Sequence, residues 1–140
     1  MKKILCILFF CLLSGCGEPP QKIFPKNGMF PDKVNNYDLT CFIEFGKNRD
    51  LVNYDLVFNA ITDYVEFRQE DWKPFQNVEI VENNPSIFAI TIENENDITY
   101  QLFKNNGSFG VDAWNNGYCI EKGYAWVIDK SNNTMIYKKN

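Results

Sequence analysis

The chain has 140 residues, with 14 Lys and Arg against 18 Asp and Glu, a formal net charge of −4, and no histidine. This length suits one domain, because domains hold about 100 to 150 residues. The absence of histidine excludes a Ser-His-Asp or Cys-His nucleophile, an imidazole metal site and an imidazole general base. Carboxylate, lysine or tyrosine chemistry remains, together with binding and structural roles.

The N-terminus has the features of an export signal. Met1-Lys2-Lys3 is a cationic start, and Ile4 to Leu13 is an unbroken apolar run of ten residues. This run is too short for a transmembrane helix, which needs about 20 residues. It matches the apolar segment of a secretory signal peptide, which is about 7 to 15 residues long. We therefore expect residues 1–15 to be a signal peptide.

The end of the leader is Leu13-Ser14-Gly15-Cys16, which resembles the lipobox of bacterial lipoproteins. The resemblance implies cleavage before Cys16, a diacylglyceryl group on its thiol and, in many bacteria, a further acyl chain such as palmitate on its new amino group. Two or more acyl chains hold a protein stably on a bilayer, whereas one gives only marginal binding. Gly17 replaces the Asp that retains many such lipoproteins on the inner membrane, so the outer membrane, facing the periplasm, is favoured in a Gram-negative host. The alternative is an ordinary cleaved leader with Cys16 near the cut by chance.

Processing changes the charge of the chain. Without Lys2 and Lys3, 12 basic side chains face 18 acidic ones, a net charge of −6. Nucleic acids and anionic headgroups both require clustered Lys and Arg, so neither is an expected partner. We expect membrane contact through lipid on Cys16 and a protein partner in the envelope or periplasm.

Two cysteines remain for the mature domain. Cys6 and Cys11 leave with the leader and Cys16 carries lipid, which leaves Cys41 and Cys119. In an oxidising compartment such a pair most simply forms a disulfide, while two separate buried thiols are the alternative. Closing a loop of about 78 residues is worth at most about 4 to 5 kcal/mol in the chain-entropy model.

Residues 16–36 are expected to form a lipidated tether between membrane and domain. Prolines fix dihedral angles and remove hydrogen-bond donors, and four of them favour an extended tether here. The apolar residues of this segment that are candidates to contact the domain are Ile23, Phe24, Met29 and Phe30.

From residue 37 to 140 the sequence alternates with a period of two, which predicts an all-β domain. In Tyr37 to Phe45 the odd-numbered residues share one face, with Cys41 pointing inward. A series of short strands of this kind indicates a small antiparallel β-sandwich or barrel. The further expected strands are 54–58, 64–68, 77–82, 86–93, 98–104, 108–114, 118–121, 124–129 and 134–138.

Asn-Gly pairs support hairpins at two places. Asn106-Gly107 and Asn116-Gly117 both accommodate the positive φ angles of hairpin turns. Near the C-terminus, Trp126 shares a predicted strand face with Tyr124 and Ile128, which favours burial of this face in the core.

Aromatic and basic residues mark the candidate binding surface. Tyr, Trp and Arg are enriched at binding hot spots, and the charged segment 63–75 contains Tyr64, Arg68 and Trp72. Trp114 lies next to an expected turn and is a fourth candidate. The alternative is a solvated strand and loop whose aromatic residues cap the core.

Catalytic motifs are missing from the sequence. It contains no phosphate-binding, dinucleotide-binding, nucleophile-elbow or C-x-x-C motif, so we expect no enzyme, no cofactor and no metal. We expect a lipid-anchored protein-binding module, such as an inhibitor or immunity protein, because lysozymes and many secreted toxins are basic and an acidic surface attracts them. The alternative is a structural or assembly component of the cell envelope.

Overall fold

The computed structural model describes residues 18–32, 36–59, 61–93, 98–112 and 114–140. The predicted leader and Cys16 lie outside these ranges. Contacts divide the chain into two compact units, of which the larger comprises Phe24–Ala125 and Tyr137–Asn140. The smaller comprises Trp126–Ile136 and the N-terminal residues up to Ile23. Within the described ranges, no helix has the length and apolar character to cross a membrane.

The described residues form eleven strands. Each strand expected from the alternating pattern is present, and the segment expected to be a tether adds one more at its start. The strands are β1 (Gln21–Ile23), β2 (Tyr37–Phe45), β3 (Asp50–Asn59), β4 (Tyr64–Gln69), β5 (Val78–Asn83), β6 (Ile87–Ile92), β7 (Thr99–Phe103), β8 (Ser108–Val111), β9 (Trp114–Glu121), β10 (Tyr124–Asp129) and β11 (Thr134–Lys139).

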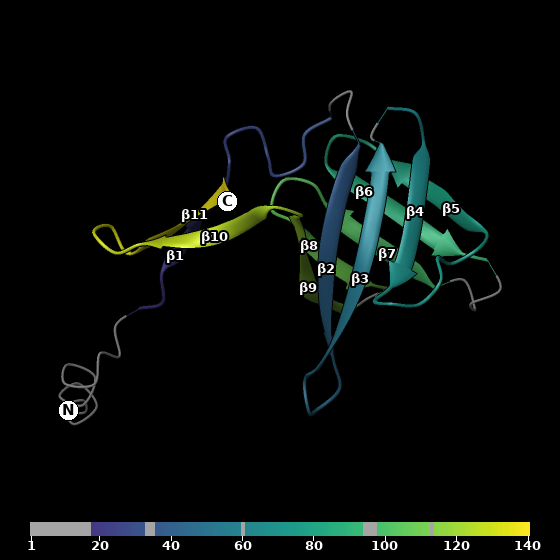
Figure 1. Cartoon of the computed structure of the whole chain (residues 1–140), viewed down its shortest axis with the longest axis horizontal. Coiled ribbons are helices and arrows are strands. Elements are labelled where there is room, and N and C mark those ends of the chain that lie inside the picture. The colour runs from purple at the N-terminus through teal and green to yellow at the C-terminus, as the bar shows by residue number, and fades with distance from the viewer. Residues whose placement is uncertain (1–17, 33–35, 60, 94–97, 113) are drawn as a thin grey trace. The chain divides into compact units, whose positions relative to one another are not determined.

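Eight strands form one antiparallel sheet in the order β4-β3-β2-β9-β8-β7-β6-β5. The sheet curls into a nearly closed barrel, with β2, β3 and β4 in front of β6 and β7 in Figure 1. The all-β antiparallel prediction is confirmed, and the architecture is the barrel. β4 and β5 are the two ends of the sheet, so the barrel has a seam between them.

Aromatic side chains fill the interior of the barrel. Phe67 is fully buried and stacks on Tyr54 with ring centroids 5.1 Å apart, and Tyr100 lies 4.8 Å from Phe67. Phe58 stacks on Phe88 at 4.2 Å. Such rings contribute large apolar area, and a fully buried side chain of this kind stabilises the fold by about 1.5 to 3 kcal/mol.

The predicted disulfide is confirmed. Cys41 on β2 and Cys119 on β9 are directly opposite each other, and both are fully buried. The bond therefore joins two neighbouring strands on the inner face of the barrel.

The two Asn-Gly pairs have different roles. Gly107 has a φ of +75° in the turn between β7 and β8, so the first hairpin prediction is confirmed. The second prediction is wrong, because Asn116 and Gly117 lie inside β9. A Cβ on Gly117 would approach the carbonyl oxygen of Phe42 to 2.0 Å, so glycine here permits close approach of the backbones of β2 and β9.

Part of the segment expected to be a tether packs on the barrel. Met29 and Phe30 are buried, and their N–H groups donate to the carbonyl oxygens of Asn105 and Lys104 at 3.2 and 3.0 Å. The barrel core thus includes residues that precede Tyr37.

The smaller unit contains most of a three-stranded sheet, in the order β1-β11-β10. β1 pairs in parallel with β11, from Gln21 opposite Thr134 to Ile23 opposite Ile136. Lys22 lies over the ring of Trp126 at 5.0 Å from the centroid, a cation–π contact. The expected burial of this face of β10 in the core is wrong, because Tyr124 and Trp126 are only half-buried and Ile128 is 52% exposed.

Candidate partner-binding face

Three of the four residues singled out from the sequence lie on β4 and the turn after it. Tyr64 is 48% exposed and Trp72 is 69% exposed. Alternation along β4 directs Tyr64 and Arg68 outward, whereas Phe67 between them is fully buried. β4 is an end strand of the sheet, so these side chains occupy one border of the barrel.

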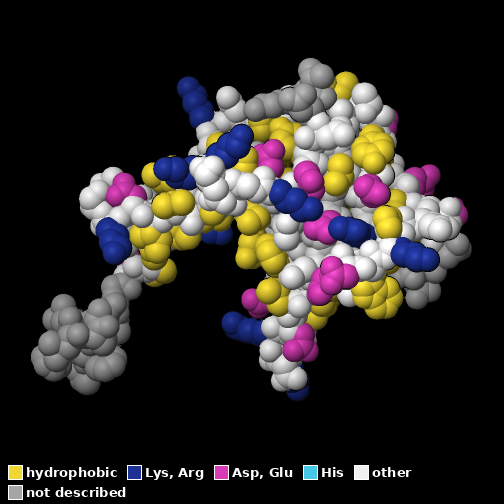
Figure 2. Space-filling model, viewed as in Figure 1, with side chains coloured by type: hydrophobic (Ala, Val, Ile, Leu, Met, Phe, Trp, Pro, Cys, Tyr) yellow, Lys and Arg dark blue, Asp and Glu magenta, His cyan; other side chains and the backbone are white. Residues whose placement is uncertain are grey.

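Arg68 belongs to a chain of ion pairs on the outer face of the barrel. Its Nε donates to Oδ2 of Asp55 at 3.1 Å, and Nζ of Lys122 lies 3.5 Å from Oδ1 of Asp55 and 3.2 Å from Oδ1 of Asp38. Figure 2 shows basic and acidic side chains interspersed over this face. Exposed pairs of this kind contribute about 0 to 1 kcal/mol each, so they orient Arg68 more than they stabilise the fold.

Trp114 is not on the same border of the barrel. Its backbone begins β9, where it pairs with Val111 of β8. β9 is separated from β4 by β2 and β3 in the sheet. The side chain of Trp114 lies outside the described part of the structure, and its role stays a prediction.

A groove of about 440 Å³ runs along the seam beside this border. It contains three acidic residues and four aliphatic ones, together with an asparagine. The lining residues are Asp63, Val65, Val78, Glu79, Ile80, Val81, Glu82 and Asn83. Sequence patterns did not reveal this groove, because it depends on which two strands end the sheet.

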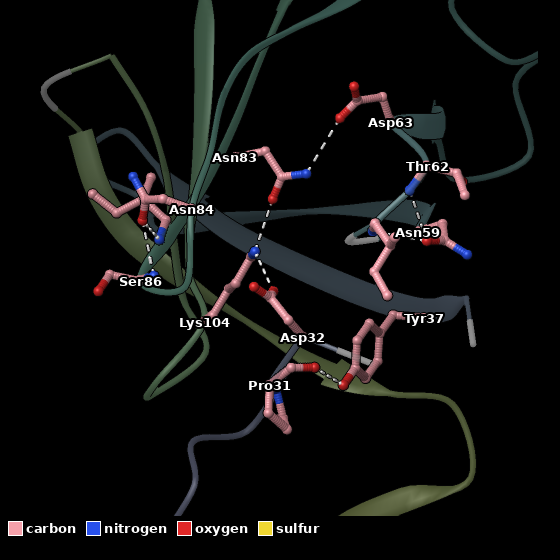
Figure 3. Close-up of polar contacts among 12 residues, drawn as sticks. Pro31, Asp32, Tyr37, Asn59, Thr62, Asp63, Asn83, Asn84, Ser86 and Lys104 are labelled. Atoms are coloured by element: carbon pink, nitrogen blue, oxygen red, sulfur yellow. Dashed lines mark hydrogen bonds and ion pairs between the residues drawn. The ribbon is translucent and has the colours of Figure 1, made fainter. Parts of the chain in front are cut away.

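A buried lysine lies close to the same groove. Lys104 is 1% exposed, and its Nζ donates to Oδ1 of Asn83 at 2.8 Å and to Oδ1 of Asp32 at 2.9 Å. The amide of Asn83 in turn donates to Asp63 at 3.5 Å (Figure 3). This network links the end of β5 to the segment that precedes β2. The burial of Lys104 could have been predicted from the sequence, because Lys104 continues the inward-facing series of Tyr100 and Leu102.

Tyrosines line a second hollow of about 640 Å³ in the larger unit. Tyr124 and Tyr137 stack there at 5.0 Å, and the hydroxyl of Tyr137 accepts a hydrogen bond from the backbone N–H of Glu121 at 2.7 Å. Burial raises the pKa of Tyr137 to about 12. The hydroxyl of Tyr37 donates to the carbonyl of Pro31, and burial with the charge of Glu121 raises its pKa to about 12 as well. These hydroxyls stay neutral at physiological pH.

The described residues contain no cluster of three or more acidic or cysteine side chains able to hold a metal ion. Comparisons with protein-family models, with curated proteins and with solved structures found no match to this chain.

Proposed function

We propose that this chain is a lipid-anchored, non-enzymatic protein-binding module of the bacterial cell envelope. The observation that carries the proposal is the exposure of Tyr64 and Trp72 at the border of a barrel whose interior is already filled by its own aromatic rings. Large aromatic side chains left in water are typical of protein-binding surfaces and often supply most of the binding energy.

The anchor rests on the sequence at the N-terminus. A cationic start, an apolar run and Leu13-Ser14-Gly15-Cys16 support export and acylation of Cys16. Cys16→Ala should abolish palmitate labelling and release the protein from membranes. Labelling of the variant at the level of the native chain would contradict the anchor.

Charge supports a role as periplasmic inhibitor or immunity protein. The mature chain, with 12 basic and 18 acidic side chains, would attract a basic secreted toxin or lysozyme. An envelope scaffold, in contrast, would use the same module for assembly.

Site-specific cross-linking in cells tests the proposal. A photoreactive amino acid replaces Trp72 in the full chain, and the matched control replaces Leu51, which is 52% exposed on β3. We expect one partner to be captured from position 72 and not from position 51. Trp72→Ala should weaken binding of that partner by roughly thirtyfold, as for a hot spot worth about 2 kcal/mol.

Three outcomes bear on the proposal. A basic toxin or lysozyme supports the inhibitor role, and recovery of scaffold proteins alone replaces it with the assembly role. Equal capture from positions 72 and 51 would mean that the β4 border is no binding surface.

A further inference from the structure

The seam of the barrel leaves two strand edges that do not pair with each other. β4 has β3 as its ladder partner and β5 has β6, and among the described strands neither has a second one. Edge strands present N–H and C=O groups that can bond an added strand. A partner strand can therefore extend the eight-stranded sheet at the seam.

The edge of β5 is the more available of the two. On β4, the carbonyl oxygens of Phe67 and Gln69 already accept hydrogen bonds from the N–H groups of Phe75 and Trp72, both at 2.8 Å. The turn after β4 thus uses part of that edge. The ladder of β5 runs to β6, from Val78 to Asn83, with one bulge between Ile80 and Glu82.

The side chains along the groove select the charge of an added strand. The described lining residues include three acids, Asp63, Glu79 and Glu82, and no Lys or Arg. Glu79 and Glu82 are exposed, as is Val81 at 52%, whereas Val78 and Ile80 are half-buried. An added strand would meet carboxylates on its outer face and aliphatic side chains on its inner face.

We propose that the groove between β4 and β5 binds an extended protein segment in which Lys or Arg alternates with apolar residues, and that this segment pairs as a strand with β5. The inference rests on the proposed protein-binding function and names the chemistry of the partner. Opposite charges on neighbouring strands attract, and the period of two places all cations of the segment on one face. A second copy of β5 does not fit, because it would bring Glu79 and Glu82 against their own like charges.

Peptide binding to the full acylated chain in zwitterionic detergent tests this pairing. The probe is a short fluorescent peptide of alternating Lys and Val, measured by anisotropy. One control peptide has Glu in place of Lys, and a second keeps Lys but carries N-methyl groups on consecutive backbone nitrogens, which blocks both of its edges. We expect no binding of the Glu peptide and roughly tenfold weaker binding of the N-methylated peptide, since it cannot complete a ladder.

Variants place the peptide in the groove. Glu79→Lys and Glu82→Lys should each weaken binding of the Lys peptide by roughly tenfold. Asp50→Lys makes the same charge change at the exposed start of β3, outside the groove, and should leave binding within about twofold of the native value. Unchanged circular dichroism and melting temperature show that each variant is folded. Equal affinity for the N-methylated peptide, or an equal loss in Asp50→Lys, would overturn the proposal.

The two proposals fail separately. If the partner captured from position 72 binds Glu79→Lys and Glu82→Lys as tightly as the native chain, the groove proposal is overturned and the binding function stands. If the Lys peptide binds as expected but position 72 captures no partner, the groove chemistry stands and the proposed function is overturned.

Discussion

The ion pair of Lys104 offers a sharp test of what holds the N-terminal segment to the barrel. Nζ of Lys104 contacts Asp32 at 2.9 Å and Asn83 at 2.8 Å. The two partners differ in solvation, because the side chain of Lys104 is 1% exposed and that of Asp32 is 38% exposed. Removing the anion therefore leaves a cation that water cannot reach, whereas removing the cation leaves an anion that water can solvate.

The expected free energies differ accordingly. Breaking a buried pair by removing one partner costs about 3 to 5 kcal/mol. Since the carboxylate of Asp32 is partly exposed, screening lowers this value, and we expect Asp32→Asn to cost about 2 kcal/mol. Lys104→Met keeps the apolar stem and removes the charge, so it should cost about 1 kcal/mol or less. The double variant should resemble Lys104→Met, because the buried charge is gone in both.

Urea unfolding of the full chain in detergent at neutral pH measures these values, with circular dichroism of the barrel as the signal. The order of stability should be native, then Lys104→Met and the double variant together, then Asp32→Asn. If Lys104→Met loses more free energy than Asp32→Asn, the lysine stabilises the fold through its hydrogen bonds and the argument from charge burial is refuted.

Three further predictions concern the barrel. Gly117→Ala places a Cβ 2.0 Å from a carbonyl oxygen of β2 and should lower the free energy of unfolding by more than about 3 kcal/mol. Gly46→Ala is the control and should cost about 1 kcal/mol, because φ is +74° there but the space around it is open. Equal losses for the two variants in urea unfolding would contradict this. Reduction of the Cys41–Cys119 bond should lower the free energy of unfolding by about 2 to 5 kcal/mol, and an unchanged unfolding midpoint under reductant would contradict this expectation. The pKa of Tyr37 is about 12 in the folded state against an ordinary 10.0. The contribution of Tyr37 to the free energy of unfolding is therefore complete below pH 10.0 and falls as the pH rises to about 12. Tyr37→Phe should reduce that alkaline loss, as measured by unfolding midpoints across this pH range.

The alternation of side chains predicted the strands well, because a half-buried sheet imposes a period of two on any sequence that forms it. The expected strand 98–104 included Lys104, whose inward position continues that of Leu102 even though β7 ends at Phe103. The alternation failed at Ile128, which shares the spacing of a core residue but is 52% exposed. A period of two distinguishes the two faces of a strand and does not determine whether a second layer covers one of them.

The candidate site was likewise predicted only in part from the sequence. Segment composition identified Tyr64, Arg68 and Trp72, and the structure exposes them on a single border of the barrel. The groove next to them was not foreseen. Its residues come from β4, β5 and the turn that precedes β4, and no local pattern states that these two strands end the sheet.

The sequence by itself determined the all-β class, most of the strand positions, the pairing of Cys41 with Cys119 as the simplest disulfide, and the acidic charge, because each depends on local periodicity or on counting. Only the tertiary structure decided that the sheet curls into a barrel, that Gly117 lets the backbones of β2 and β9 approach closely instead of forming a turn, and that Lys104 forms an ion pair with Asp32. These features depend on which distant segments become neighbours. That choice follows from the burial and twist of the whole sheet, which no short stretch of sequence encodes.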